Sequence, residues 1–392
     1  MKKIAIITAT RAEYGLFVPI IREFRKRENN NFHIDLIITG THLSNEYGHT
    51  IDEIKKDEFR IDYLIDIPVN NFKAKDISNN MATTLIKFTE HFENEKYDAI
   101  MVLGDRYEIL SVAIAAMNTK IPIFHLCGGD TTEGAIDEGI RHSITKLSYL
   151  HFVSNEMSRR RVIQLGENPS RVFNVGSTSV DNILHTDLLS KSDVLKSIGL
   201  NECRYALCTY HPVTLNNVDL HKLVYDFLDV IRDCKDIEFI VTKSNSDLGG
   251  SLINQILDQE QNKIPNLHVY TSLGMQRYLS LMKYSEFVLG NSSSGIIETP
   301  SFKIPTVNIG DRQKGRLQCD SIINCLDNKN SIMQAVSIAR SVKMKEKCKE
   351  IISPYGEGNA AIQIVDISMS FLEKTIDLKK TFYDIKEEFI KE

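Results

Sequence analysis

The densest run of side chains that could do chemistry lies between residues 125 and 142. It begins with a histidine and a double-glycine turn. Four carboxylates, a second histidine and an arginine then follow: His125, Gly128, Gly129, Asp130, Glu133, Asp137, Glu138, Arg141 and His142. Carboxylates and imidazoles can pass protons to and from a substrate, and burial can separate their pKa values. We interpret the segment as acid–base machinery, although a charged surface loop would have a similar composition.

The same segment does not predict a metal site. Its helical spacing contains no H-E-x-x-H pair, and the seven cysteines of the chain include no CxxC pair. A single cysteine such as Cys127 is more typical of a small buried hydrophobic residue than of a ligand. We therefore expect no metal, and no other motif indicates a cofactor.

Three other loops in the first half place ionisable side chains after a predicted strand. The first contains only Gly15, so it lacks the G-x-G-x-x-G pattern of nicotinamide-binding domains. Arg11 in that loop suits an anion, although a surface arginine is the alternative. His42 is either a binding residue or a solvated histidine. Asp105 is either a functional carboxylate or a helix N-cap, and Arg106 beside it adds a second anion contact.

The second half carries small hydroxyl side chains in place of carboxylates. Residues 290–300 read GNSSSGIIETP, and Ser292, Ser293 and Ser294 lie at a predicted helix start. Hydroxyls and backbone amides at such a position can hold a phosphate. Glu298, about one turn further on, could accept hydrogen bonds from the hydroxyls of a ribose. A plain serine N-cap is the alternative for this segment.

Two more loops of the second half are candidates for binding. His211 ends a predicted strand and precedes Pro212, which indicates a positioned imidazole. Residues 310–316 read GDRQKGR and follow another predicted strand. Their three cations, among them Arg316, suit a phosphate.

Short apolar runs alternate with helical patterns along the chain, which is typical of doubly wound α/β domains. Strands are predicted at residues 3–8, 33–39, 62–67, 99–103, 121–126 and 151–153, and then at 205–209, 238–242, 267–270, 287–289, 306–309 and 321–325. Runs that are apolar throughout indicate parallel strands covered on both faces. Ligands of such sheets bind beyond the carboxyl ends of the strands. Two facing domains would therefore bring the candidate loops to one cleft.

A polar stretch over residues 176–203 separates the two sets of strands. We place an N-terminal Rossmann-like domain at residues 1–180 and a C-terminal one at residues 181–374. Two helical patterns, at 359–374 and 382–391, follow. The last helices, at about 375–392, are predicted to complete the N-terminal domain.

The composition fits at least two globular domains. The chain has 392 residues, of which 42% are hydrophobic and 25% charged, and its net charge is −5. This balance argues against a nucleic-acid binder, and no apolar run approaches the roughly 18 residues of a membrane helix. The first apolar run is too short for a secretory signal. With seven cysteines and no paired motif, we expect a cytoplasmic protein without disulfides.

Seven short motifs, taken in order, make the sequence similar to a known family. RAEYG, GTHLS, LGDRYE, the H-x-x-GG-D segment with DEGIRHSITK, a strand ending in HP, GNSSSGIIE and GDRQKGR resemble the hydrolysing UDP-N-acetylglucosamine 2-epimerases of bacterial sialic-acid biosynthesis. The resemblance covers residues 1–372. It implies a GT-B fold of two Rossmann-like domains, with UDP held mainly by the second and a terminal helix crossing back to the first. It also implies a homodimer or homotetramer that takes a UDP-sugar.

The resemblance implies a two-step reaction. A base removes the proton at C2 of the sugar and UDP leaves from C1 by anti elimination, which gives 2-acetamidoglucal. Water then adds syn and N-acetylmannosamine is released. Asp105, Asp137 and His211 match catalytic positions of the family. The candidate substrate-binding set is Arg11, His42, Arg106, Arg141, His142, Ser292, Ser293, Ser294, Glu298 and Arg316.

One position departs from many relatives, which have a glutamate where this chain has Cys127. Asp130 or Glu133 is then the alternative carboxylate for that role. The departure also leaves the sugar open, since UDP-2,4-diacetamido-2,4,6-trideoxyglucose, a precursor for legionaminic acid, would undergo the same chemistry. A non-hydrolysing 2-epimerase, a GT-B glycosyltransferase and a nucleotide-sugar sensor without catalysis are also compatible with these motifs.

Overall fold

A computed structural model describes residues 1–44, 49–69, 73–131, 136–212, 219–244 and 249–385 of the chain. Their contacts divide into two units, each with a parallel sheet of its own. The first unit contains residues 1–130 and 136–182 and the chain from Gly356 on. The second contains residue 131 and residues 183–355. Each unit is described by itself.

The first unit has a seven-stranded sheet in the order β3-β2-β1-β4-β5-β6-β7. Its strands are β1 (Lys2–Thr8), β2 (Phe32–Thr39), β3 (Tyr63–Ile65), β4 (Ala99–Leu103), β5 (Ile123–Leu126), β6 (Leu150–Val153) and β7 (Val172–Asn174). In the central strand Ile6 lies in register with Leu36 of β2 on one side and Met101 of β4 on the other. The six strands predicted for this half are confirmed. The edge strand β7 is not predicted, because it has three residues and only Val172 is buried.

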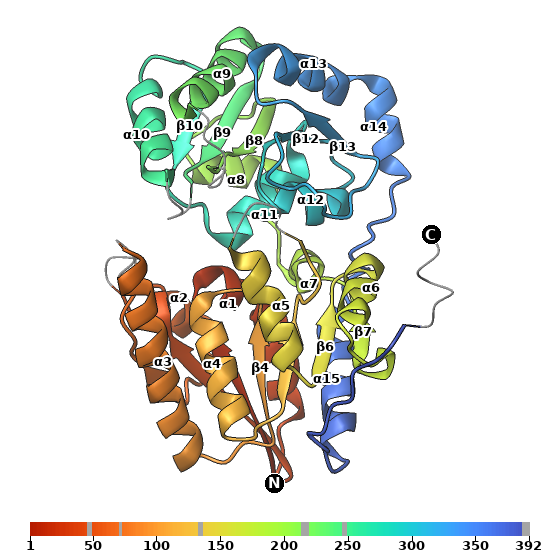
Figure 1. Cartoon of the computed structure of the whole chain (residues 1–392). Helices are drawn as coiled ribbons and strands as arrows, with labels where there is room; N and C mark the ends of the chain where they lie inside the picture. Colours follow the sequence, from red (N-terminus) through yellow and green to blue (C-terminus); the bar gives the residue numbers. More distant parts are fainter. Residues whose placement is uncertain (45–48, 70–72, 132–135, 213–218, 245–248, 386–392) are drawn as a thin grey trace. The chain divides into compact units, whose positions relative to one another are not determined.

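Helices cover both faces of this sheet (Figure 1). They are α1 (Arg11–Arg27), α2 (Ile51–Lys56), α3 (Ala74–Asn94), α4 (Tyr107–Asn118), α5 (Asp137–Leu147), α6 (Glu156–Gln164) and α15 (Ala360–Leu372), with the short 3-10 helices η1 (Gly40–Leu43) and η2 (Pro169–Arg171). Alternate residues of β1 point to opposite faces. Ile4 and Ile6 pack with α1 and α15, while Ala5 and Ile7 pack with α3 and α4. The apolar runs are therefore strands buried on both faces, as expected.

The chain returns to the first unit at Gly356, which is earlier than the position near 375 that the sequence suggests. The reason is α15, whose apolar face packs against α1. Its first amides, those of Ala360 and Ala361, donate to the buried carboxylate of Asp181 at 3.2 and 2.9 Å. The helix predicted at 382–391 is wrong for residues 382–385, which have no helical structure, and residues 386–392 lie outside the described part.

The second unit has a six-stranded sheet in the order β10-β9-β8-β11-β12-β13. Its strands are β8 (Tyr205–Thr209), β9 (Glu238–Thr242), β10 (Leu267–Tyr270), β11 (Val288–Gly290), β12 (Thr306–Ile309) and β13 (Ile322–Cys325), all close to the predicted positions. The helices are α8 (Lys191–Ser197), α9 (Leu220–Asp233), α10 (Gly250–Glu260), α11 (Gly274–Tyr284), α12 (Ser294–Ile297), α13 (Lys329–Arg340) and α14 (Val342–Lys349), with η3 (Thr299–Phe302). Helix α7 (Thr178–His185) contains the last residues of the first unit and the first of the second.

Each strand order reverses direction once, and this fixes where a ligand can bind. The chain moves outward from β1 to β2 and β3, then returns to β4 on the other side; β8 and β11 have the same relation in the second unit. A crevice opens beyond the carboxyl ends of the strands at such a switch point. The loops after β1, β4, β8 and β11 are therefore the first places to look for a site. Among the described helices, none is long and apolar enough to span a membrane.

Candidate functional site

The loop after β4 presents Asp105 at the switch point of the first unit. Helix α4 begins at Tyr107, its N-cap is Arg106, and no side chain caps it. The alternative that Asp105 caps this helix is therefore wrong. Gly104, with φ of +79°, turns the chain at this point, and the Asp105 side chain is 26% exposed. Asp105 is thus available for interactions across the loops.

Arg141 of α5 joins the loop after β4 to the loop after β5. One guanidinium nitrogen pairs with the carboxylate of Asp105. The other donates to the backbone oxygen of Asp130 at 2.6 Å and to the carboxylate of Glu138 at 3.2 Å. The Arg141 side chain is only 4% exposed, so its bonds are shielded from water and hold both loops in place. The structure thus brings Asp105, Asp130 and Arg141 together.

His125 joins the loop after β4 to α5 and is not accessible to solvent. It is fully buried in β5; Nε2 contacts the backbone oxygen of Gly104 at 2.9 Å and Nδ1 contacts the Thr145 hydroxyl at 3.2 Å. Burial lowers its pKa to about 3, so the ring is neutral at physiological pH. His125 therefore has no part in the acid–base chemistry that the sequence suggests for this segment.

Two serines that sequence reasoning missed fix the side chain of Asp130. The hydroxyls of Ser154 and Ser158 donate to the same oxygen of Asp130, at 3.1 and 2.6 Å. The only signal in the sequence is the pattern Ser154-Asn155, where Asn155 caps α6. Gly129 lies so close to α6 that a Cβ on it would be 2.3 Å from the backbone oxygen of Ser158. Asp130 is therefore an oriented carboxylate, and the Gly-Gly turn is a packing requirement.

Asp137 and His142 extend the group along α5. Asp137 is the first residue of the helix. Burial acts to lower the pKa of Arg106, but the charges of Glu108, Glu13 and Asp137 raise it. Nε2 of His142 contacts Glu138 at 3.2 Å, whereas its buried Nδ1 has no hydrogen-bond partner within the described part of the chain. Glu133 lies outside the described residues.

The loops after β1 and β2 are built around His42, which is 1% exposed. Its Nε2 contacts the Thr8 hydroxyl at 3.1 Å and its Nδ1 contacts the Thr50 hydroxyl at 2.8 Å. Burial lowers its pKa to about 4. The alternative of a solvated histidine is wrong, because the ring is buried and its two nitrogens join η1 to Thr8 of β1 and to Thr50 at the start of α2. Arg11, in contrast, is 43% exposed and pairs with Glu53 at 3.0 Å.

Cys127 adopts a left-handed backbone conformation, with φ of +63°. This is uncommon for a residue with a side chain. Its amide donates to the backbone oxygen of Phe152 at 2.9 Å, and its side chain packs against the core on the α1 face. The position therefore depends on tight loop geometry whichever side chain occupies it.

In the second unit, Asn291 organises the loops after β8 and β11. Its side chain accepts from the His211 amide at 2.7 Å and donates to the His211 oxygen at 2.8 Å. Its own backbone oxygen accepts from the side chains of Gln313 at 2.8 Å and Arg312 at 3.2 Å. Asn291 is 1% exposed. Sequence reasoning missed this residue, although its position just after a strand is the signal.

His211 is held on its other side by the Ser244 hydroxyl, 3.1 Å from Nδ1. The imidazole is thus fixed at the carboxyl end of β8, as the sequence predicts. Gly290 lets the two strands approach here, since a Cβ on it would lie 2.0 Å from the Thr209 oxygen. The backbone at this switch point therefore tolerates no side chain.

The serines after β11 form a hydroxyl chain. The hydroxyls of Ser292 and Ser294 are 3.1 Å apart, and the Tyr278 hydroxyl is 2.7 Å from that of Ser294. Ser293 is the N-cap of α12, without a side-chain cap bond, and Glu298 is its C-cap. Burial, with the Glu298 charge as a second cause, raises the pKa of Tyr278 to about 12. Helix α12 has only four residues, so its dipole is weak. Side-chain hydroxyls are therefore the main groups that this loop offers to an anionic ligand.

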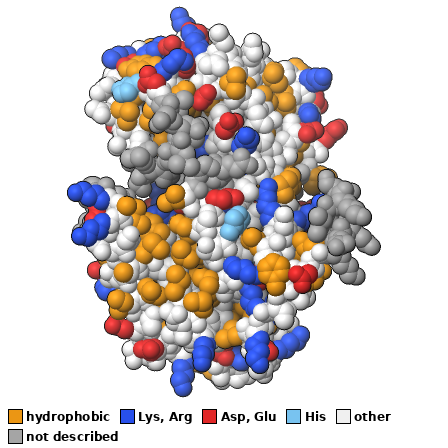
Figure 2. All heavy atoms as spheres, in the orientation of Figure 1, with side chains coloured by type: hydrophobic (Ala, Val, Ile, Leu, Met, Phe, Trp, Pro, Cys, Tyr) orange, Lys and Arg blue, Asp and Glu red, His pale blue; other side chains and the backbone are white. Residues whose placement is uncertain are grey.

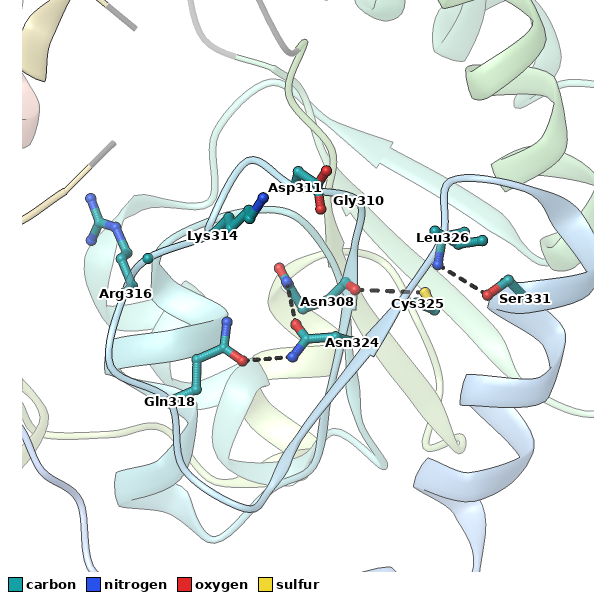
Figure 3. A pocket seen from close by; sticks show the side chains of 11 residues that line it. Asn308, Gly310, Asp311, Lys314, Arg316, Gln318, Asn324, Cys325, Leu326 and Ser331 are labelled. Atoms are coloured by element: carbon teal, nitrogen blue, oxygen red, sulfur yellow. Dashed lines mark hydrogen bonds between the residues drawn. The ribbon is translucent and has the colours of Figure 1, made fainter. Parts of the chain in front are cut away.

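A cavity of about 530 Å³ lies at the carboxyl ends of β12 and β13 (Figure 3). Two of the three cations predicted in the 310–316 loop, Lys314 and Arg316, line it, and in Figure 3 the Arg316 side chain extends away from the amides of Asn308 and Asn324. Those two amides are bonded at 2.8 Å. The cavity therefore adjoins the 310–316 loop without including the serine loop.

One group of described residues has the spacing for a metal ion, namely His33, Asp35 and Asp62. Its carboxylates are already paired with cations: Lys3 with Asp35 at 2.7 Å and Arg25 with Asp62 at 2.9 Å. The group lies on β2 and just before β3, away from the carboxyl ends of the strands. It is better explained as an ion-pair network than as a metal centre.

The chain resembles known proteins over nearly its whole length. A family model described as UDP-N-acetylglucosamine 2-epimerase matches residues 25–369. Polysialic acid biosynthesis protein P7 of Escherichia coli is 40% identical over 388 residues, covering 99% of this chain and 98% of that protein. The GDP/UDP-N,N'-diacetylbacillosamine 2-epimerase (hydrolyzing) of Campylobacter jejuni is 40% identical over 388 residues, covering 98% of this chain and 99% of the relative.

The fold has a close match among solved structures. The crystal structure of UDP-GlcNAc 2-epimerase from Neisseria meningitidis bound to UDP-GlcNAc aligns with a TM-score of 0.81 at 20% identity. It covers 94% of this chain and 100% of that one. The expected GT-B fold of two Rossmann-like α/β units is confirmed.

Proposed function

The chain belongs to the UDP-N-acetylglucosamine 2-epimerase family, and from this premise we propose that it is a hydrolysing member that converts UDP-N-acetylglucosamine and water to N-acetylmannosamine and UDP. The observation that carries the proposal is the Arg141 bridge, which holds Asp105 and the Asp130 loop together at the switch point of the first unit. The product would supply sialic-acid synthesis. The 40% identity to a polysialic acid biosynthesis protein supports that pathway.

The proposed chemistry needs groups that accept and return protons. In the first step a carboxylate takes the proton from C2, the electron pair forms the C1=C2 double bond, and the C1–O bond to UDP breaks. In the second step the oxygen of water bonds to C1 and a proton returns to C2. We assign these transfers to Asp105, Asp130 and Asp137, with Asp105 as the first candidate for the base. Arg141 and the serine pair on Asp130 keep the carboxylates oriented.

The second unit would hold the leaving group. Hydroxyls and cations suit a diphosphate, since both donate hydrogen bonds to anionic oxygens. We assign this role to Ser292, Ser293, Ser294 and Arg316, and we propose Arg11 and Arg106 as further cations for the diphosphate. Glu298 would accept hydrogen bonds from the ribose. His211, fixed by Asn291 and Ser244, is the proposed imidazole beside the reacting sugar.

A second candidate substrate has an observation of its own. The Campylobacter jejuni relative, named for N,N'-diacetylbacillosamine, is as similar to this chain as the polysialic acid protein is. The same elimination and hydration would apply to UDP-2,4-diacetamido-2,4,6-trideoxyglucose, because the chemistry involves only C1 and C2. Cys127, which replaces a glutamate found in many relatives, is the first position to compare between the two substrates.

The test is to incubate the enzyme with each UDP-sugar and no acceptor, and to identify both products. UDP together with the free 2-epimeric sugar supports the proposal, and the faster of the two substrates identifies the sugar. A UDP-linked epimer as the final product would indicate a non-hydrolysing enzyme. Release of UDP only after an acceptor is added would indicate a glycosyltransferase. Binding of both sugars with no turnover would indicate a sensor.

We also propose that the protein acts in the cytoplasm as a homodimer or homotetramer. All seven cysteines are free thiols, which suits a reducing compartment.

Figure 2 shows hydrophobic side chains gathered over α3 and α4, where Ile86 and Met117 are 59% and 48% exposed. An apolar face of this kind is typical of a subunit interface. Light scattering on the purified protein tests the oligomer, and a monomeric mass at micromolar concentration would contradict it.

A further inference from the structure

A buried carboxylate pair lies beneath the two loops assigned to the diphosphate. Glu13 is in the first turn of α1 and is 4% exposed. One of its oxygens accepts from the amides of Ala9 and Thr10, at 2.7 and 3.2 Å. Its other oxygen has no hydrogen-bond partner within the described part of the chain. With Thr10 it forms a capping box, so the side chain is fixed by the loop that carries Arg11.

Glu108 is the second member of the pair. It lies in the first turn of α4 and is fully buried. The Tyr107 hydroxyl lies close to its carboxylate, which pairs with the cation of Arg106, whose Nε is 3.5 Å away. That nitrogen is itself buried and without a hydrogen-bond partner among the described residues. Glu108 and Arg106 thus form a buried ion pair, and Glu13 acts on both of them through its charge.

The charges of this group do not balance if both carboxylates are ionised. Two buried anions would face one guanidinium, and a buried charge without a partner is costly. Burial raises the pKa of Glu13 to about 8; Glu108 also raises it, while the Ala9 amide and Arg106 lower it. Near pH 7 Glu13 is therefore mostly protonated, and one anion faces one cation.

Other groups face the pair from the neighbouring elements. The charge of Asp137 on α5 also acts on Arg106, and the Tyr107 hydroxyl lies near Glu108. Burial and Glu108 raise the pKa of Tyr107, so this hydroxyl stays neutral across the neutral range. His42, on η1, is neutral as well. Glu13 is then the group of this site whose charge changes near pH 8.

We propose that Glu13 and Glu108 are positioning residues that carry one shared negative charge beneath Arg106, and that this single charge keeps Arg106 and the Arg11 loop set for the diphosphate. The inference rests on the proposed function, because it takes a diphosphate as the ligand. When Glu13 loses its proton, the group of Glu13, Glu108 and Arg106 gains a net negative charge, which repels an anionic diphosphate. The affinity for UDP then falls, while the carboxylates around Asp105 are not directly altered.

Glutamine at position 13 separates charge from shape. Its carbonyl oxygen can accept from the Ala9 and Thr10 amides, and its NH2 group takes the place of the unpartnered oxygen. Glu13→Gln is therefore expected to bind UDP as wild type does at pH 7 and to keep that affinity at higher pH. Glu108→Gln should also remove the alkaline loss, because only one carboxylate remains. Glu23→Gln, on the same helix and paired with Arg27 at 2.8 Å, is the matched control.

The experiment is calorimetric titration of UDP into all four proteins from pH 6.5 to 9.5, with thermal melts to confirm folding. Wild type and the Glu23 control are expected to lose about tenfold in affinity above pH 8, and the two pair variants less than about twofold. An alkaline loss in Glu13→Gln as large as that in wild type would overturn this inference alone. So would a tenfold loss in Glu13→Gln already at pH 7. If none of the proteins binds UDP, the inference and the proposed function both fail.

Discussion

At their switch points the first unit has buried charged groups, whereas the second has mainly neutral hydrogen-bonding groups. In the first, Asp105 and Asp130 are held by Arg141, and the pair of Glu13 and Glu108 faces Arg106. In the second, Asn291 joins the loops through neutral amide hydrogen bonds, and the serines form a hydroxyl chain. Charged groups that are buried and paired suit proton transfer. Neutral donors suit an anionic ligand, since they bind it without bringing a negative charge of their own.

The largest effect should come from the carboxylate of the first unit. Asp105→Asn keeps the size of the side chain and removes its charge. We expect the turnover rate to fall by about a thousandfold, because the proton acceptor is lost. The affinity for UDP should change less than about threefold, because the residues that bind the diphosphate are unchanged. Steady-state kinetics and calorimetry measure the two quantities.

A matched control for this variant lies at the other end of the same strand. Asp98 precedes β4 and binds the Lys3 amide at 2.9 Å. Asp98→Asn should leave turnover close to that of wild type. If Asp105→Asn lost UDP affinity as strongly as turnover, the carboxylate would be structural and the division of labour between the units would be wrong.

The second expected effect concerns acid stability. Burial lowers the pKa of His42 to about 4 and that of His125 to about 3, and both lie in the first unit. The unfolded chain takes up these protons near pH 6.5 and the folded unit does not, so stability falls as the pH drops from 6.5 through 4 to 3. We expect the first unit to lose at least about 3 kcal/mol by pH 4.

Glu167 adds a contribution of the same sign at lower pH. Burial acts to raise its pKa, but bonds from His151, Lys380 and Lys146 lower it to about 2. Its contribution is present above about pH 4.5 and is lost as the pH falls through 2. Pulse-labelling hydrogen exchange after equilibration at each pH follows both units at once. Peptides of the second unit opening before those of the first would contradict this expectation.

A smaller effect is expected from the amide network of the second unit. Asn291→Ala removes the bonds that fix His211 and leaves the His211 amide and oxygen without their partner. We expect a loss of about 2 kcal/mol in stability and weaker UDP binding, by about tenfold, with a smaller change in turnover. Asn324→Ala, on β13 two strands away, is the control. A large loss of turnover at unchanged UDP affinity would place proton transfer in the second unit as well.

The smallest effect should come from Cys127→Glu. The new carboxylate would occupy the position at which the family resemblance implies a glutamate, next to a turn whose geometry is already fixed. We expect the ratio of kcat/KM between the two UDP-sugars to shift by about tenfold or less, because a single side chain discriminates weakly between similar substrates. Competition between the two sugars measures the ratio. An unchanged ratio would mean that the cysteine serves only packing.

Much of this arrangement could be predicted from the sequence, since loops after buried strands must lie at one edge of a parallel sheet. Asp105, Asp130, Arg141 and His211 could be located in that way. Arg141 and Asp105 are 36 positions apart, and their pairing depends on the packing of α5 against α4, which no local pattern encodes. Partners that act across the fold were missed for the same reason, as with Ser154 and Ser158 on Asp130.

His42 shows the opposite error, in which a local pattern predicts the wrong environment. A histidine in a polar loop suggests solvent exposure, yet η1 folds over β1 and buries the ring. The capping box of Thr10 and Glu13 was readable in the sequence, as T-x-x-E before an apolar run. What the motif could not indicate is that Glu108 lies beside it, because that depends on how α1 and α4 flank adjacent strands.

The central claim is that the enzyme breaks and remakes the C–H bond at C2 while water replaces UDP at C1. NMR of the reaction with UDP-N-acetylglucosamine in deuterated water tests this directly. We expect the products to be UDP and N-acetylmannosamine that carries deuterium at C2, with no acceptor present. A product that retains hydrogen at C2, or UDP release that requires an acceptor, would contradict it.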